Sequence, residues 1–310
     1  MGAPLVLPWS RPCAGAPVES PEPRSWCTLG FSTYGMPSLT TEAAIDHISK
    51  VGFDAVELAI RAGADADAAH LPSARRRAIA QLLRDRRLRL SSLMEHVFPA
   101  RQQQGVLERL RLAAQLAHDL SPDSPPIIQT VLGSGAFSAN KGMLRDALGQ
   151  WVALADANAI TLAIKPHRGG VVSRPSEAIW LLEQLGSPAR LKMVYDYSHF
   201  AYRGMDLAAT IQQSLPHTVH VAVKDVVRES HRVRFALPGS TGTIDYRQLL
   251  SQFFAGGYRG DFNCEVSSML WSAPDYDPLA ACRSCYAAMS RLFQQADVPR
   301  PSSSAAAQAN

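Results

Sequence analysis

The sequence contains few cysteines and no long apolar run. Its five cysteines are an odd, sparse set in 310 residues, which argues against a disulfide framework and favours a reducing compartment such as the cytoplasm. No apolar run is long enough to span a membrane, so we expect no membrane partner. The first residues, MGAPLVLPW, carry no basic region, and Pro4 and Pro8 interrupt their short apolar run. We therefore expect no secretory signal.

The sequence also lacks the motifs of nucleotide and nucleic-acid binding. The first predicted strand runs into LGFSTYG rather than GxGxxG, which argues against an open dinucleotide-binding sheet. The net charge is +4, and much of the basic excess is arginine in stretches such as SARRRAIAQLLRDRRLRL (73–90). Because no aromatic residues are interleaved there, we interpret this stretch as a solvated helix face and expect no nucleic-acid partner.

Short apolar runs and helical periods alternate eight times along the chain. The strand candidates are residues 27–33, 53–60, 89–95, 126–132, 160–166, 191–197, 217–224 and 259–266. The helix candidates are residues 41–51, 74–87, 103–119, 140–157, 175–185, 205–214, 245–255 and 278–294. Such alternation implies parallel strands with right-handed crossovers. Eight units of this size predict an α/β fold, a closed (β/α)8 TIM barrel.

The two ends of the chain differ from the repeating part. Residues 1–25 are rich in proline, alanine and glycine, and residues 297–310 are mainly proline, serine and alanine. Both have little apolar surface to bury, so we expect a disordered N-terminal extension and a disordered C-terminal tail. Residues 26–296 then form a single barrel domain.

Polar residues gather where the predicted strands end. In a barrel of this type the chemistry is located at the C-terminal ends of the strands. The polar residues at these ends are Glu57, Glu95, His96, Gln129, Lys165, His167, Asp196, His199, His220, Lys224, Asp225 and Glu265. The lysine after the fifth strand is unusual, because a buried strand delivers it into the centre of this face.

Six motifs occur in order along these strands. They are GFDAVELAI, LAIKPHRGG, VYDYSHF, VHVAVKD, LPGSTGTIDY and YRGDFNCE. Together, over roughly residues 27–294, they resemble the sugar phosphate isomerase/epimerase family with its xylose isomerase-like TIM barrel. The family includes sugar epimerases, isomerases, inosose dehydratases and dehydroshikimate dehydratases. The resemblance implies a fold but not a substrate, because this fold hosts many chemistries.

The resemblance also implies a divalent metal, usually Mn, Mg, Co or Zn. Its ligands in the family are a Glu after strand 5, an Asp after strand 6, a His on strand 7 and a Glu after strand 8. Asp196 and Glu265 match two of these positions, whereas Lys165 and Ala222 replace the other two. A protonated lysine is no ligand and repels a cation, so we favour a metal-free site. The alternative is a metal held by Asp196, His199 and Glu265.

Lys165, Asp196 and Glu265 are the predicted catalytic residues, and their arrangement has three interpretations. In the first, the ammonium replaces the metal and polarises a carbonyl or stabilises an enolate. In the second, Lys165 forms a Schiff base, which needs a lowered pKa that the two carboxylates oppose. In the third, a structural ion pair remains in a barrel that has lost catalysis. We favour the first interpretation, followed by the third.

Seven other residues are predicted to bind substrate. His167 and His199 match family positions near the substrate, and Glu57 matches the strand 2 glutamate. The remaining four are placed around the mouth: Glu95, Lys224, Arg228 on the loop after strand 7, and Trp271 as a pocket wall. Strand alternation places His220 one layer deeper in the barrel than Ala222, so we interpret it as a packed core histidine.

These observations predict an enzyme of the sugar phosphate isomerase/epimerase type. It would act on a small polyhydroxylated or keto substrate by proton transfer next to a carbonyl, as an isomerase, epimerase or dehydratase. Loss of the strand 5 glutamate favours a dehydratase or lyase over a two-base epimerase. The alternative is an inactive barrel that serves as a binding or scaffold protein. A small-molecule substrate is the expected partner, and a homo-oligomer is compatible with the sequence.

Overall fold

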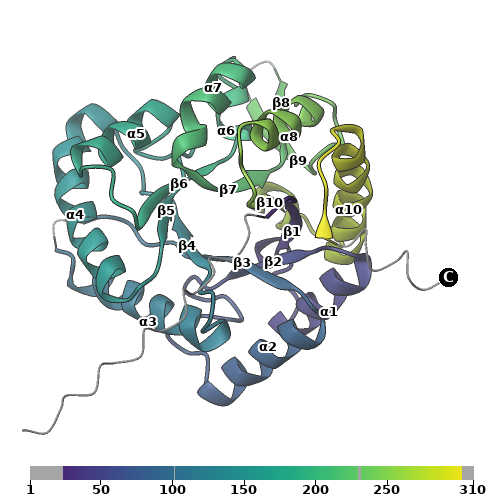
Figure 1. The fold of residues 1–310 in the computed structure, drawn as a ribbon, viewed down its shortest axis with the longest axis horizontal. Helices are drawn as coiled ribbons and strands as arrows, with labels where there is room; N and C mark the ends of the chain where they lie inside the picture. The colour runs from purple at the N-terminus through teal and green to yellow at the C-terminus, as the bar shows by residue number, and fades with distance from the viewer. Residues whose placement is uncertain (1–23, 101, 230–231, 302–310) are drawn as a thin grey trace, which may run out of the picture.

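Eight parallel strands close into a barrel in the computed structural model, which describes residues 24–100, 102–229 and 232–301. Neighbouring strands follow the order β1-β10-β7-β6-β5-β4-β3-β2, with β1 closing the ring between β10 and β2 (Figure 1). The strands are β1 (Thr28–Ser32), β2 (Ala55–Ala59), β3 (Arg89–Met94), β4 (Ile127–Thr130), β5 (Leu162–Ile164), β6 (Leu191–Tyr195), β7 (Thr218–Val223) and β10 (Asp261–Cys264). The predicted (β/α)8 barrel is confirmed.

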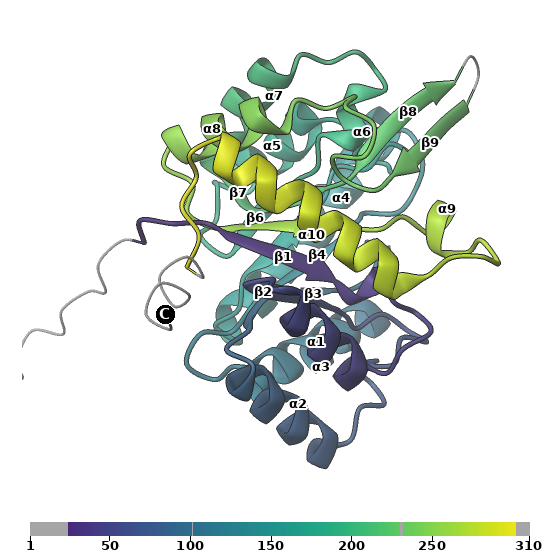
Figure 2. The same ribbon diagram turned by 90° about the vertical axis from the view of Figure 1, so that its right-hand side faces the viewer.

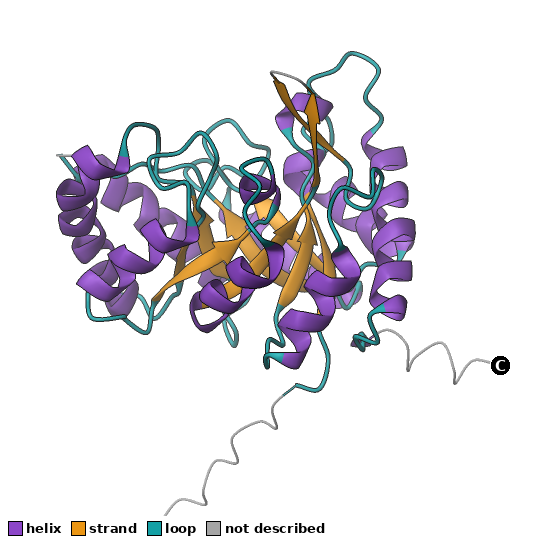
Figure 3. Cartoon of the chain, turned by 90° about the horizontal axis from the view of Figure 1, so that it is seen from above, coloured by secondary structure: helices purple, strands orange, loops and turns teal. Residues whose placement is uncertain are grey.

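Eight longer helices lie around the strands in the described ranges, and Figure 3 shows helices on both sides of the strands. They are α1 (Thr41–Val51), α2 (Ser73–Asp85), α3 (Gln104–Leu120), α4 (Phe137–Ala157), α5 (Pro175–Gln184), α7 (Leu207–Ser214), α8 (Tyr246–Ala255) and α10 (Pro278–Gln295). Thr40 and Asp206 cap α1 and α7 through their side chains, and Pro175 opens α5. Gly52 ends α1 with φ of 107°, a left-handed conformation that favours glycine. None of the helices in the described ranges is long and apolar enough to cross a bilayer.

The main core lies between the strands and this ring of helices. Phe31 of β1 and Phe262 of β10 are fully buried, as are Ile45 of α1 and Trp151 of α4. Every strand residue of β1, β2 and β10 is buried, because a parallel barrel is covered on both faces. The barrel therefore holds the C-terminal ends of its strands on a closely packed support.

An antiparallel hairpin follows β7, where the sequence predicted only a loop. It comprises β8 (Asp225–Glu229) and β9 (Arg232–Ala236), and it stands away from the barrel in Figure 2. Val226 pairs with Phe235, and Arg228 pairs with Val233. Arg228 is thus an exposed strand residue rather than a loop residue. The carboxylate of Asp225 anchors the hairpin by accepting hydrogen bonds from the next loop, at Gly239 and Thr241.

The chain after α10 packs against the N-terminal end of the barrel. Val298 is buried, and Arg300 forms an ion pair with Asp54 at 2.7 Å. The Pro299 carbonyl accepts a hydrogen bond from the amide of Cys27 at 3.0 Å. Residues 297–301 are therefore part of the packed barrel, although we expected the tail to begin at 297. The expected disorder of residues 1–23 and 302–310 lies outside the described residues.

Short helical turns complete the C-terminal face of the barrel. They are the 3-10 turn η1 (Thr33–Gly35) and the helices α6 (Ser198–Ala201) and α9 (Ser268–Trp271), whereas the 3-10 turn η2 (Leu215–His217) directly precedes β7 and lies at the opposite end of the barrel. η1 and α9 follow β1 and β10, while α6 follows β6. These turns, rather than the long helices, carry several of the side chains around the candidate site.

Candidate active site

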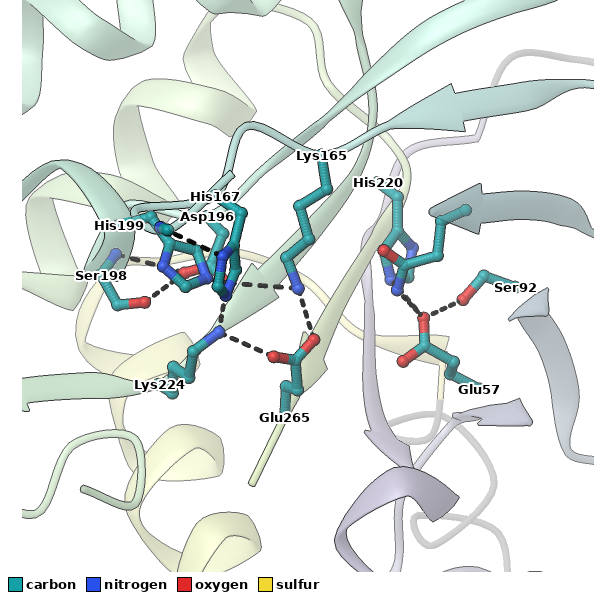
Figure 4. Close-up of polar contacts among 12 residues, drawn as sticks. Glu57, Ser92, Lys165, His167, Asp196, Ser198, His199, His220, Lys224 and Glu265 are labelled. Atoms are coloured by element: carbon teal, nitrogen blue, oxygen red, sulfur yellow. Dashed lines mark hydrogen bonds and ion pairs between the residues drawn. The ribbon is translucent and has the colours of Figure 1, made fainter. Parts of the chain in front are cut away.

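Two lysines and two carboxylates meet at the C-terminal end of the barrel (Figure 4). Lys165, Asp196, Lys224 and Glu265 directly follow β5, β6, β7 and β10. Lys165 contacts Glu265 and lies 3.3 Å from Asp196, measured from Nζ to Oδ2. Lys224 contacts Asp196 and lies 2.7 Å from Glu265, measured from Nζ to Oε1. We call these four residues the ion cluster.

The ion cluster is almost fully buried and carries no net charge. The exposed fractions are 4% for Lys165, 0% for Asp196, 2% for Lys224 and 6% for Glu265. Burial alone would lower the pKa of Lys165, but Glu265 and Asp196 raise it above its ordinary value. Burial would raise the pKa of Glu265, but Lys165 and Lys224 hold it well below its ordinary value. Both carboxylates and Lys165 are therefore charged at neutral pH.

Two neutral histidines pack against each other beside the ion cluster. The rings of His167 and His199 lie 4.1 Å apart between centroids, and His199 Nε2 lies 3.3 Å from Asp196 Oδ2. Burial lowers the pKa of His199 to about 4 against the opposing effect of Asp196. Burial, then the neighbouring His199 and the two lysines, lower the pKa of His167 to about 2. Both rings therefore carry a single N–H at neutral pH.

The orientation of His167 follows from its backbone loop. Its Nδ1 accepts a hydrogen bond from the amide of Gly169 at 3.3 Å, so Nε2 of the neutral ring carries the proton. His167 is half-buried, whereas His199 is fully buried. Phe235 of β9 packs edge-on against His199 at 5.3 Å and lies 5.2 Å from the Lys224 ammonium. The hairpin thus covers one side of the ion cluster.

Glu57 and His220 form a separate polar pair inside the barrel, also drawn in Figure 4. Glu57 Oε2 accepts hydrogen bonds from Ser92 and Gln129, and His220 Nε2 lies 3.4 Å away from it. Burial would raise the pKa of Glu57, but His220 lowers it below its ordinary value. All four side chains are buried. His220 is the packed core histidine that strand alternation predicts, and Glu57 is held by protein groups.

Three predicted substrate-binding residues take other places. Glu95 is 1% exposed, and its carboxylate accepts hydrogen bonds from Arg109 of α3 at 2.7 Å and from the amide of His96. It therefore links β3 to α3 instead of facing a substrate. Lys224 belongs to the ion cluster, and Arg228 lies exposed on the hairpin.

Trp271 lies beside residues that the sequence reasoning did not single out. Its ring contacts Tyr34 of η1 edge-on, with centroids 5.5 Å apart. The guanidinium of Arg61, two residues after β2, lies over the same Tyr34 ring at 5.5 Å. Arg61 could have been found, because it is a polar residue directly after an apolar run, LAIR. Tyr34 gives no such signal in the sequence.

The residues at this site do not fit a divalent metal. The lysine ammoniums occupy oxygens of both Asp196 and Glu265, which are two of the three ligands in the alternative set. Ala222 offers no donor atom and packs with Ala163 and Val194. Within the described ranges, no group of three or more His, Cys, Asp or Glu residues is arranged to hold a metal ion. Two cations at this position would repel a third.

Comparison with known proteins identifies the barrel. The family model for the xylose isomerase-like TIM barrel matches residues 45–282. Over 139 residues the chain is 25% identical to an inosose dehydratase of Geobacillus thermodenitrificans (strain NG80-2). That match covers 40% of this chain and 46% of the dehydratase, so it spans about half the length of this relative.

Solved structures share the fold at lower sequence identity. The 3-keto-D-glucoside 4-epimerase YcjR of E. coli superposes with a TM-score of 0.66 at 15% identity, covering 86% of this chain and 99% of that one. The IolI protein, which binds a zinc atom, superposes with a TM-score of 0.70 at 14% identity, covering 86% and 98%. With the family model matching most of the barrel, the chain belongs to the xylose isomerase-like TIM barrel family.

Proposed function

We propose that this protein is an enzyme that moves a proton at the carbon next to a carbonyl in a small polyhydroxylated substrate. The ion cluster carries this proposal, because two ammonium groups stand between Asp196 and Glu265, the two carboxylates at positions that the family resemblance assigns to metal ligands. The matched proteins include an inosose dehydratase and a 3-keto-D-glucoside 4-epimerase, which supports a reaction of this kind. In this proposal the lysines supply the positive charge that a divalent metal supplies elsewhere.

The ammonium of Lys165 would bind the carbonyl oxygen of the substrate. Removal of a proton from the adjacent carbon turns this oxygen into an enolate, whose negative charge is stabilised by a fixed cation. The effect is large in a buried site, because little water is present to screen it. Lys224 stays bonded to Asp196 and Glu265 and keeps the remaining charges balanced.

Glu265 is the better placed of the two carboxylates to take the proton. It is 6% exposed, whereas Asp196 is 0% exposed and also accepts hydrogen bonds from the hydroxyl and amide of Ser198. In the free protein Lys165 lowers the pKa of Glu265. When the substrate oxygen engages Lys165, this stabilisation weakens and Glu265 becomes more basic. Substrate binding thus activates the base.

Dehydration is the outcome that the site favours. Glu265 removes the proton from the carbon next to the carbonyl, and the electron pair forms the enolate. The carbonyl then re-forms as the bond from the next carbon to its hydroxyl breaks, and Lys165 protonates the departing hydroxyl to give water. A two-base epimerase would need a second carboxylate opposite Glu265, but Lys165 occupies that position. The half-buried His167 would orient the substrate through its Nε2 proton.

The test is deuterium incorporation and water loss, followed by NMR in heavy water. The substrates are 2-keto-inositols, ketohexoses, ketopentoses and their phosphates, each with and without a chelator. We expect one substrate class to react equally in both conditions, and Glu265→Gln to abolish the reaction. Glu108→Gln, on an exposed pair with Arg111, is the matched control and should react normally. A folded wild-type protein that exchanges no proton in any of them contradicts the proposal.

A non-catalytic barrel is the second candidate, favoured by one observation. All four charges of the ion cluster already satisfy one another, as they do in structural ion networks. If the barrel is non-catalytic, the wild-type protein exchanges no proton of any substrate. Simultaneous replacement of Lys165 and Glu265 then leaves its affinity for ligands unchanged. The exchange assay therefore separates the two candidates.

A further inference from the structure

Arg61 is a half-buried arginine without an ionic partner among the described residues. It follows β2 on the same end of the barrel as the ion cluster. Its Nε atom is buried and has no hydrogen-bond partner within the described ranges. By contrast, Arg75 binds Glu42 and Asp65 nearby. Because the guanidinium group only donates hydrogen bonds, Arg61 leaves a positive donor unsatisfied.

A second unsatisfied donor belongs to a residue that is far from Arg61 in the sequence but contacts the same Tyr34 ring. The indole N–H of Trp271 is buried and has no partner among the residues that the structure describes. Both Trp271 and Arg61 contact the ring of Tyr34, each at 5.5 Å from its centroid. An indole nitrogen can only donate. Two buried donors without acceptors around one aromatic ring indicate a ligand group that is rich in acceptor oxygens.

Space and position agree with such a ligand group. Arg61 and Tyr34 border a cavity of about 60 Å³, and Trp271 lies outside its lining, against the Tyr34 ring. The cavity has the volume of a few water molecules, which suits one functional group rather than a whole sugar. Asp65 borders the same cavity, but Arg75 and Thr41 already hold its carboxylate. His96 contacts Tyr34 at 6.1 Å, and its pKa is lowered by burial, then by Arg61, and raised by Glu265. The Tyr34 ring therefore contacts Arg61, Trp271 and His96, all of which follow barrel strands at the C-terminal end.

We propose that Arg61 and Trp271 form a subsite around Tyr34 that binds an anionic oxygen group of the substrate, a carboxylate or a phosphate. This inference rests on the proposed function, and it narrows the substrate to an anionic polyol or keto compound. The anionic end would lie against Tyr34, while the reacting carbon faces Lys165 and Glu265. Arg61 would then fix the substrate by charge-assisted hydrogen bonds and would not touch the reacting carbon.

The experiment is calorimetric titration of the full chain with inorganic phosphate and, separately, with acetate. We expect one anion per chain, with Arg61→Met weakening binding by about tenfold or more and Arg61→Lys by less, because lysine keeps the charge but not the fork of donors. Trp271→Phe should weaken binding by roughly threefold to tenfold, since it removes one hydrogen bond. Arg111→Met is the matched control and should bind like the wild type. Preference for phosphate or for acetate identifies the anion.

A kinetic readout separates this inference from the proposed function. With each ketose offered as the neutral sugar and as its phosphate or carboxylate, Arg61→Met should raise KM for the anionic form alone and leave kcat within about threefold. If no substrate reacts but Arg61 still governs anion binding, the proposed function fails and the subsite stands. The subsite is overturned if the wild type binds neither anion. It is also overturned if Lys165→Met, rather than Arg61→Met, abolishes binding, because the anion then occupies the ion cluster.

Discussion

Simultaneous replacement of Lys165 and Glu265 should cost far less stability than the sum of the two single replacements. Each single change leaves one unbalanced charge in a site whose members are at most 6% exposed. Breaking one partner of a buried pair costs ~3–5 kcal/mol. Because Lys224 still contacts Glu265 at 2.7 Å, and Asp196 still lies 3.3 Å from Lys165, we expect the lower end of this range for either change.

The double variant Lys165→Met with Glu265→Gln restores a neutral cluster. Lys224 and Asp196 remain in contact and balance each other. If the two single variants each lose about 3 kcal/mol, independent effects would sum to about 6 kcal/mol, whereas a coupled pair should lose about 3 kcal/mol or less. The expected coupling is therefore about 3 kcal/mol.

Urea unfolding followed by circular dichroism at pH 7 measures these free energies. The exposed pair Glu108 and Arg111, 3.4 Å apart and more than half exposed, is the control. Glu108→Gln and Arg111→Met should couple by no more than about 0.5 kcal/mol. If the double variant loses the sum of the two single losses in unfolding free energy, to within about 0.5 kcal/mol, the assigned geometry of the ion cluster is refuted.

Three further results are expected. Lys165→Glu together with Ala222→His should take up about one Zn²⁺ or Mn²⁺ per chain by elemental mass spectrometry, because it restores four ligands and leaves the single ammonium of Lys224 against three carboxylates. Equal uptake by the wild type contradicts this. Burial would raise the pKa of Asp67, but Arg109 and nearby amides hold it at about 2, so its contribution to stability is present above about pH 4 and is lost as pH falls towards 2. Arg109→Met should therefore lower the Tm more at pH 7 than at pH 3. An equal loss of Tm at both pH values would contradict this prediction. Phe235→Ala should cost about 3 kcal/mol in urea unfolding, because it empties the space beside His199 and Lys224; a loss near zero contradicts close packing of the hairpin.

Periodicity in the sequence was sufficient to predict the barrel. The helix expected at 41–51 occurs over those residues, and the helix expected at 175–185 ends one residue earlier. The hairpin at 225–236 was missed, because one short antiparallel excursion interrupts a pattern that otherwise alternates strand and helix. The packed segment 297–301 was missed because its contact with Asp54 joins residues that are far apart in the sequence.

The candidate site was predicted in part, for a geometric reason. Lys165 and Asp196 follow the neighbouring strands β5 and β6, and Glu265 follows β10 on the far side of β7; the C-terminal ends of all parallel barrel strands meet at one face. The place of Lys224 depends on how far a flexible four-carbon side chain reaches, which strand alternation does not determine. Likewise, the pairing of Glu95 with Arg109 depends on how α3 packs against the barrel. Strand order thus predicts which residues gather, but not which of them pair.

The metal content of the purified protein tests the central claim most directly. It is measured by elemental mass spectrometry after gel filtration, before and after chelation, alongside the proton-exchange assay. Because Lys165 and Lys224 occupy the carboxylates of Asp196 and Glu265, we expect far less than one equivalent of Mn, Co, Zn or Mg and exchange that is insensitive to the chelator. About one equivalent that survives gel filtration, with exchange lost on its removal, would contradict lysine replacement of the metal.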